Sequence, residues 1–150
     1  MAHTFTAIHL HIIFSTAGRL PLISQELKPR LFAYLGGIVR SMNGTALIVN
    51  GIEDHVHLLS EIPTTLAIAD FMRDLKANST NWVKETFPER GDFKWQTGYA
   101  AFSVSKSGLD SVRTYIEQQE EHHRKRTFQE EYLAFLRKHE IEYDPRFVFD

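Results

Sequence analysis

Apolar and polar residues alternate along the segment from Thr6 to Phe14, which predicts a β-strand. Because neighbouring side chains of a strand point to opposite faces, this segment should have one face for a core and a second face that carries histidines. The positions expected on the first face are Ile8, Leu10, Ile12 and Phe14, and those expected on the second are His9, His11 and Ile13.

Four other segments repeat their apolar residues every three or four positions, the spacing of a helix that buries one side. They predict helices over residues 28–42, from residue 65 past residue 83, from residue 109 onward, and over residues 127–138. Thr65 is expected to cap the second helix, and Thr127 and Glu130 have the spacing of a capping box at the start of the last one.

Three further strands are predicted, over residues 45–53, 56–62 and 99–105, and the short connection at Glu53 and Asp54 indicates a hairpin between the first two. The order strand, helix, strand, strand, helix, strand, followed by two helices, is typical of an α+β, ferredoxin-like (split βαβ) antiparallel sheet. The first two helices should cover one face of the sheet. The added C-terminal helix that carries Tyr115 is the natural cover for the other face, where the histidines are expected.

Length and composition fit a single domain over residues 1–150. The chain has 150 residues, and 43% of them are hydrophobic, which is enough for a core. It has no cysteine, so disulfides and thiolate metal sites are excluded and a cytoplasmic location is expected. No segment reads as a signal sequence or as a membrane span. The net charge of −2 does not indicate a polyanion partner, although it leaves room for local basic patches.

Chemistry is suggested by His55-Val56-His57 together with Tyr115 and Gln119. Two histidines separated by one residue in a strand point the same way, as a pair of metal ligands would. Residues four apart in a helix share a face, so a phenol and an amide oxygen are expected to approach one point. Either feature alone is more often an ordinary polar or packing residue, and the combination is what favours a site.

These residues resemble the HUH single-tyrosine transposases of small bacterial insertion sequences, including the REP-associated tyrosine transposases. The resemblance lies in DHVHLL and in the later YIEQQEEHHRKRTFQEE, and it extends from IIFSTAGRLPLI to EYDPRFVFD, which is nearly the whole chain. It implies that His55, His57 and Gln119 bind a divalent metal, Mg²⁺ or Mn²⁺, and that Tyr115 is the catalytic nucleophile. It implies no residues for any other cofactor.

The same resemblance implies an enzyme that cuts single-stranded DNA at hairpin-bearing ends and rejoins it through a 5′-phosphotyrosine. It also implies a homodimer, in which the tyrosine of one subunit can complete the histidine site of the other. The DNA target sequence is not readable from the chain.

Three alternatives stay open. A domesticated REP-associated tyrosine transposase would use the same residues on repeated hairpins without mobilising itself. A non-catalytic module for single-stranded nucleic acid would use the sheet as a stacking platform and should carry aromatic residues on its open face. A metal-dependent hydrolase would use His9, His11, His55 and His57, and would leave Tyr115 without a role.

Overall fold

The computed structural model describes residues 3–150, which form an α+β fold around one four-stranded antiparallel sheet. The strands lie in the order β2-β3-β1-β4, so β3 and β1 are the central pair, as in the ferredoxin-like sheet that the element order predicted. Their bounds are β1 (His9–Ser15), β2 (Thr45–Ile52), β3 (His55–Glu61) and β4 (Ala100–Val104). The helices are α1 (Leu27–Ser41), α2 (Ile68–Thr86), α3 (Leu109–Glu117), α4 (Gln119–His122) and α5 (Phe128–Lys138), and short 3-10 turns lie at Ala17–Arg19, Pro88–Arg90 and Lys106–Gly108.

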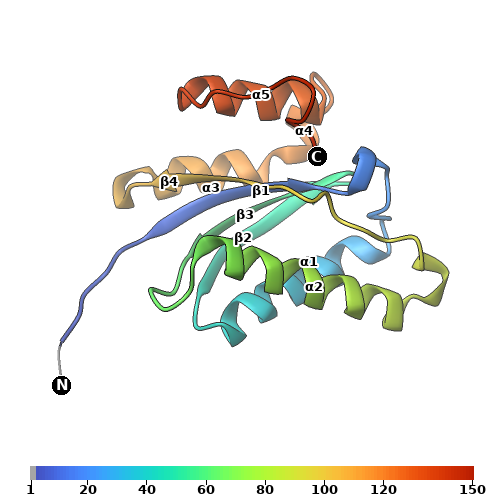
Figure 1. Ribbon diagram of the computed structural model, residues 1–150, viewed down its shortest axis with the longest axis horizontal. Coiled ribbons are helices and arrows are strands. Elements are labelled where there is room, and N and C mark those ends of the chain that lie inside the picture. Colours follow the sequence, from blue (N-terminus) through green and yellow to red (C-terminus); the bar gives the residue numbers. More distant parts are fainter. Residues whose placement is uncertain (1–2) are drawn as a thin grey trace.

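One face of the sheet is packed against α1 and α2, which lie side by side beneath it in Figure 1. Ile12, Phe14 and Val56 point to this side and are fully buried. Their helical partners are apolar residues at the predicted spacing: Leu27, Leu31, Leu35, Phe71, Met72 and Leu75. This face is the large apolar core of the molecule, and burial of its side chains is the main force that holds the two helices to the sheet.

The opposite face is covered by α3, α4 and α5, the last forming the outer layer in Figure 1. Two small apolar clusters lie here. One groups Ile13 with Phe128 and Leu136 of α5, and the other groups Leu59 with Ile116 of α3. The histidines lie on this same face, because β1 and β3 pair with Ile13 opposite His57 and Ser15 opposite His55.

The hairpin between β2 and β3 places the histidine pair at the start of β3. Gly51 pairs with Val56, and a Cβ atom at Gly51 would overlap the backbone of His55, so only glycine allows the two strands to approach this closely.

Three predicted boundaries are wrong. β1 begins at His9, not Thr6, and Ile8 is 46% exposed instead of lying on the core face. Thr65 caps nothing, since α2 begins at Ile68 after an extended Ala67 that gives no side-chain hydrogen bond. The helix expected to carry both Tyr115 and Gln119 is interrupted: α3 ends at Glu117 and Gln119 begins the separate α4.

The capping box is confirmed. The Thr127 side chain accepts a hydrogen bond from the Glu130 amide, the Glu130 side chain accepts from the Thr127 amide, and α5 runs to Lys138 as predicted. Within residues 3–150, no helix is both long enough and apolar enough to cross a bilayer.

Candidate active site

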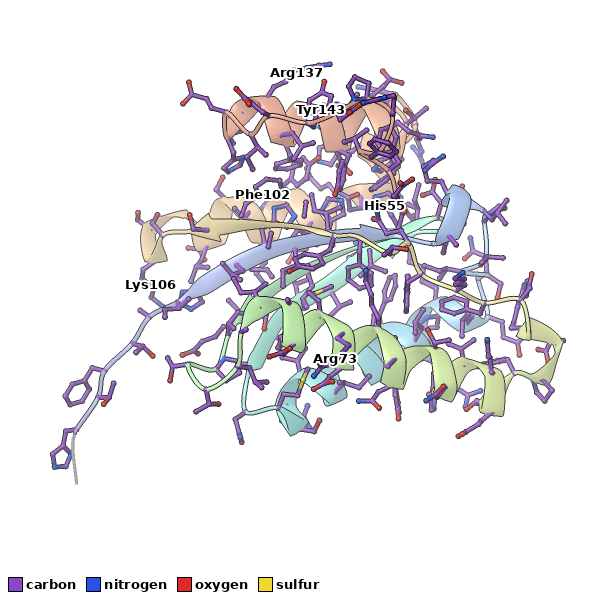
Figure 2. The ribbon with its side chains drawn as sticks, viewed as in Figure 1. His55, Arg73, Phe102, Lys106, Arg137 and Tyr143 are labelled. Atoms are coloured by element: carbon purple, nitrogen blue, oxygen red, sulfur yellow. The ribbon has the colours of Figure 1, made fainter. Side chains whose placement is uncertain are left out.

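His55 and His57 are fully buried on the α5 side of β3, and neither side chain has any exposed surface. Figure 2 shows His55 between the sheet and the upper helices, on the side of the sheet opposite Arg73 of α2. The outward-facing ring nitrogen of each histidine is held by a neighbour. His55 Nδ1 lies 2.7 Å from Asp54 Oδ1, and His57 Nδ1 lies 2.7 Å from Nε2 of His11. These contacts fix both rings so that their Nε2 atoms face the same space.

Glu131 of α5 enters that space, and the sequence had not indicated it. Its Oε1 atom lies 2.9 Å from His57 Nε2, 3.1 Å from His123 Nε2 and 3.4 Å from His55 Nε2. Glu131 is fully buried, although carboxylates are rarely buried without partners. A signal was present, because Glu131 lies in the apolar stripe of its helix between Phe128 and Phe135, where a packing residue would be expected.

Gln119 and His123 complete the group from α4 and the turn after it. Gln119 Oε1 lies 3.0 Å from His55 Nε2 and 3.1 Å from His123 Nε2, while its amide nitrogen donates to Glu131 Oε2 at 3.2 Å. Gln119 is fully buried. The amide oxygen therefore reaches the histidines as the sequence predicted, although the route is a break between two helices and not one continuous helical face.

Tyr115 lies at the edge of this group, half-buried, with its hydroxyl turned inward. The hydroxyl donates a short hydrogen bond to Glu131 Oε2 and accepts one of 3.1 Å from Arg126 Nη2. Its ring centroid is 6.0 Å from that of His57. Tyr115, His55, His57 and Gln119, the four residues singled out in the sequence, thus lie together within one chain.

The electrostatics of the two histidines differ. Burial lowers the pKa of His55, but its hydrogen bonds to Asp54 and Glu131 outweigh burial and raise the pKa to about 9. Burial dominates at His57 and lowers its pKa to about 4, against the opposing effect of Glu131. His57 is therefore a neutral imidazole at pH 7, whereas His55 holds a proton when no cation replaces it.

The pKa values of the two acids also move apart. Burial favours the neutral form of Glu131, but the hydrogen bonds from His123, His55 and His57 prevail and hold its pKa below the usual range. Burial and the nearby Glu131 carboxylate raise the pKa of the Tyr115 hydroxyl, against the opposing effect of Arg126. In this arrangement the carboxylate is ionised and the phenol is protonated at neutral pH.

The group has the make-up of a metal site. His55, His57, His123 and Glu131 each offer a ligand atom, and these atoms lie within 4.8 Å of one another. Imidazole and carboxylate ligands suit Mn²⁺ and related divalent ions. The contacts of the outer ring nitrogens with Asp54 and His11 resemble those that orient ligating histidines in metalloproteins. The residues present therefore fit a divalent cation.

A cavity of about 330 Å³ opens beside Tyr115, between α3 and α5. Arg126 and Lys138 supply positive charge to its wall, and Phe135 and His11 supply ring faces. The aromatic residues Trp95 and Phe102, by contrast, are buried and are not available to stack on a bound base.

Two of the alternatives lose support. The histidine face is covered by α3 and α5, so it is not an open platform for stacking nucleic acid. Among the described residues, the group whose ligand atoms converge includes neither His9 nor His11, both of which the hydrolase alternative required.

Comparison with known proteins agrees with a transposase on this fold. The chain is 28% identical over 127 residues to the transposase for insertion sequence element IS200 of Salmonella typhimurium, covering 79% of this chain and 81% of that protein. The Salmonella typhi transposase of the same element matches equally. Residues 4–119 match the family model described as "Transposase IS200 like", and the chain belongs to that family.

Two solved structures share the fold. One is a protein from Deinococcus radiodurans R1 assigned as a transposase, with a TM-score of 0.62, 24% identity, and coverage of 79% of this chain and 96% of that one. The other is a REP-associated tyrosine transposase bound to a REP hairpin, with a TM-score of 0.52, 10% identity, and coverage of 79% and 70%. The match to the family model ends at Gln119, so α5 and its Glu131 lie outside the matched residues.

Proposed function

We propose that the protein is a metal-dependent transposase that cleaves and rejoins single-stranded DNA through Tyr115. The proposal rests on one observation: an inward-turned tyrosine hydroxyl lies beside a buried histidine pair, in a chain that belongs to a transposase family. An ordinary packing tyrosine needs one hydrogen-bond partner, whereas Tyr115 lies between the cation Arg126 and the anion Glu131.

In the proposed reaction the Tyr115 oxygen attacks a phosphorus of the DNA strand. The tyrosine hydroxyl loses its proton, a bond forms between its oxygen and phosphorus, and the bond from phosphorus to the 3′-oxygen breaks. The 3′-oxygen takes up a proton, so the products are a 5′-phosphotyrosine and a free 3′-hydroxyl. The phosphodiester energy is kept, so a later attack by a 3′-hydroxyl can rejoin the strand without a nucleotide cofactor.

His55, His57 and Gln119 are the proposed ligands of a divalent ion, Mg²⁺ or Mn²⁺. When bound, such an ion polarises the phosphate and neutralises charge that develops on the leaving oxygen. The residues of the chain supply the rest: Asp54 and His11 keep the two imidazoles in place, and Arg126 donates to the oxygen of Tyr115 and favours its ionised form.

The cavity beside Tyr115 is the proposed entry of the strand. Its positive residues Arg126 and Lys138 suit phosphates, and the exposed part of the Phe135 ring suits a base. One related fold is bound to a REP hairpin, which supports hairpin-bearing single-stranded DNA as the substrate. A domesticated relative that acts on repeated hairpins would use the same residues and is the second candidate, favoured by that same likeness.

The proposed test incubates the protein with end-labelled, hairpin-bearing single-stranded DNA and Mn²⁺, and then separates the products under denaturing conditions. The wild-type protein and the control Tyr143→Phe should form a protein–DNA adduct, and Tyr115→Phe should form none. An adduct that persists in Tyr115→Phe, or cleavage that leaves only free ends, would contradict the tyrosine mechanism.

We further propose that the chain is one catalytic domain that works as a homodimer, and that a site can be completed by the tyrosine of the other subunit. Mixing Tyr115→Phe with His57→Ala subunits tests this. Recovered cleavage would mean that each mixed dimer assembles one intact site from two chains. No recovery would mean that Tyr115 acts on its own chain's histidines, beside which it lies here.

A further inference from the structure

Five polar atoms of the site face one small space. Three ring nitrogens, the Nε2 atoms of His55, His57 and His123, all face oxygen acceptors, namely Gln119 Oε1 or Glu131 Oε1. The amide of Gln119 cannot turn to offer its nitrogen instead, because that nitrogen already donates to Glu131 Oε2.

His55 shows what this space can hold. Its Nδ1 atom contacts Asp54, which as a carboxylate can only accept, so the proton of a neutral ring lies on Nδ1. Its Nε2 atom then carries a lone pair and faces the oxygens of Gln119 and Glu131, which carry lone pairs too. Lone pairs that face each other in a buried site are costly, so a proton on Nε2 lies among these atoms in the metal-free protein, and a cation can take its place.

The spacing of the atoms suits a cation. Ligand atoms that share one ion at about 2.0–2.2 Å lie roughly 2.9–3.5 Å apart, for the angles of ordinary octahedral or tetrahedral sites. Glu131 Oε1 lies 2.9, 3.1 and 3.4 Å from the three Nε2 atoms. Gln119 Oε1 lies 3.0 and 3.1 Å from two of them. Each of these two oxygens thus already lies near ligand spacing from two or three of the ring nitrogens.

We propose that Glu131 is a metal ligand supplied by the C-terminal helix, and that metal binding thereby fixes α5 over the histidine face together with Tyr115. One oxygen of its carboxylate faces the histidines, and the other accepts the hydrogen bond of the tyrosine hydroxyl. His123 contributes the third imidazole. The inference rests on the metal dependence proposed above, but it does not depend on the tyrosine chemistry.

This role explains why a buried carboxylate interrupts the apolar stripe of α5. Phe128, Tyr132 and Leu136 hold the helix to Ile13 and Phe102 of the sheet by packing, and they do not require a charge among them. A carboxylate bound to a divalent ion adds a directed contact that fixes the position of the helix, not only its face. The metal, α5 and the tyrosine then form one connected unit.

The first test measures Mn²⁺ binding by the full chain, from the electron paramagnetic resonance signal of the free ion. Glu131→Gln should weaken binding by at least about tenfold to a hundredfold, the loss typical when a residue that only orients a metal ligand is removed. Glu131→Asp, which keeps the carboxylate, should recover part of the loss. Glu142→Gln makes the same charge change at an exposed position after α5 and should bind as the wild-type protein does.

The second test needs no variant and therefore stands even if Glu131→Gln does not fold. Saturating Mn²⁺ should slow amide hydrogen exchange in α5 of the wild-type protein, with little change in α1, which lies on the other face of the sheet. Unchanged exchange in α5, or wild-type affinity in a folded Glu131→Gln, would overturn the inference. Either result would overturn only the role of Glu131, because a tyrosine–DNA adduct would still form if the proposed function is right. The failure of this inference is therefore distinguishable from the failure of the proposed function.

Discussion

The two faces of the sheet are both covered by helices, and they are built from different kinds of residue. Beneath the sheet, α1 and α2 pack with Phe14, Leu58 and other side chains that are almost all apolar. Above it, α3, α4 and α5 enclose histidines, an amide and a carboxylate between two small apolar clusters. Neighbouring residues of β3 thus serve different purposes: Leu58 holds the fold together, and His57 is placed for chemistry. The lower face needs shape and volume alone, whereas the upper face needs particular atoms at particular distances.

The sharpest contrast is between His57→Ala and Leu58→Ala, adjacent residues on opposite faces. Leu58→Ala should lower the free energy of unfolding by about 2–5 kcal/mol, because it leaves a cavity in the core. It should leave the stabilisation by Mn²⁺ intact. His57→Ala should abolish that stabilisation, which for the wild-type protein amounts to about 2.7 kcal/mol when the ion is at a hundred times its Kd. Thermal unfolding with and without Mn²⁺ measures both. If His57→Ala kept the full Mn²⁺ effect, the assignment of the upper face to metal binding would be wrong.

Asp54 tests whether the surroundings of the histidines matter as much as the histidines themselves. Asp54→Ala removes the partner of His55 Nδ1 and should weaken Mn²⁺ binding about tenfold to a hundredfold, since the ring loses its fixed orientation. Glu53→Ala, at the exposed neighbouring position, is the matched control and should change little. Isothermal titration calorimetry with Mn²⁺ measures the affinity of each variant, and equal affinities would contradict the role of Asp54.

The pH dependence of the upper face should follow His55, whose pKa is about 9. At pH 7 this ring is protonated in the metal-free protein and must lose its proton to bind a cation. The Mn²⁺ affinity should therefore rise about tenfold per pH unit from pH 7 to near 9. A flat profile, measured by titration at several pH values, would contradict the protonated state of His55.

His55 also affects the free energy of unfolding of the metal-free protein, which should fall as pH rises, whereas the Mn²⁺ affinity should increase. Since folding raises the pKa of His55, its contribution to stability is fully present below the ordinary histidine pKa of about 6.5 and is lost as pH rises through about 9. The variant His55→Gln should lack this loss. On the lower face, burial lowers the pKa of Lys76 of α2 to about 8, so the slope that belongs to His55 is the difference between the wild-type protein and His55→Gln.

The smallest effect concerns the position of α5. Thr127→Ala removes the capping box and should cost about 1 kcal/mol of unfolding free energy. Thr65→Ala is the matched control, because Thr65 is exposed and gives no cap to α2, and it should change stability by a few tenths of a kcal/mol at most. Chemical denaturation can resolve the difference. Equal costs would mean that the start of α5 is not fixed by its cap.

The buried residues of the lower face were predictable because the local spacing of apolar residues identifies them. Alternation in β1 and β3, and the helical repeat in α1 and α2, identify the buried residues without knowledge of distant parts of the chain. The same alternation correctly put His55 and His57 on the other side. Glu131 could not be predicted in this way, because its role depends on where a helix 74 residues beyond His57 lies across the sheet. The break before Gln119 was missed for a similar reason: its backbone follows the packing around the site, not the local propensity.

The most direct test of the central claim is to locate the covalent bond itself. The protein is reacted with hairpin-bearing single-stranded DNA and Mn²⁺, digested with trypsin and nuclease, and analysed by tandem mass spectrometry. The account predicts a nucleotide-bearing phosphate on Tyr115, in the peptide that follows Arg113, and no such adduct on any other residue. A phosphate on another side chain, or cleaved DNA without any protein-bound phosphate, would contradict the account.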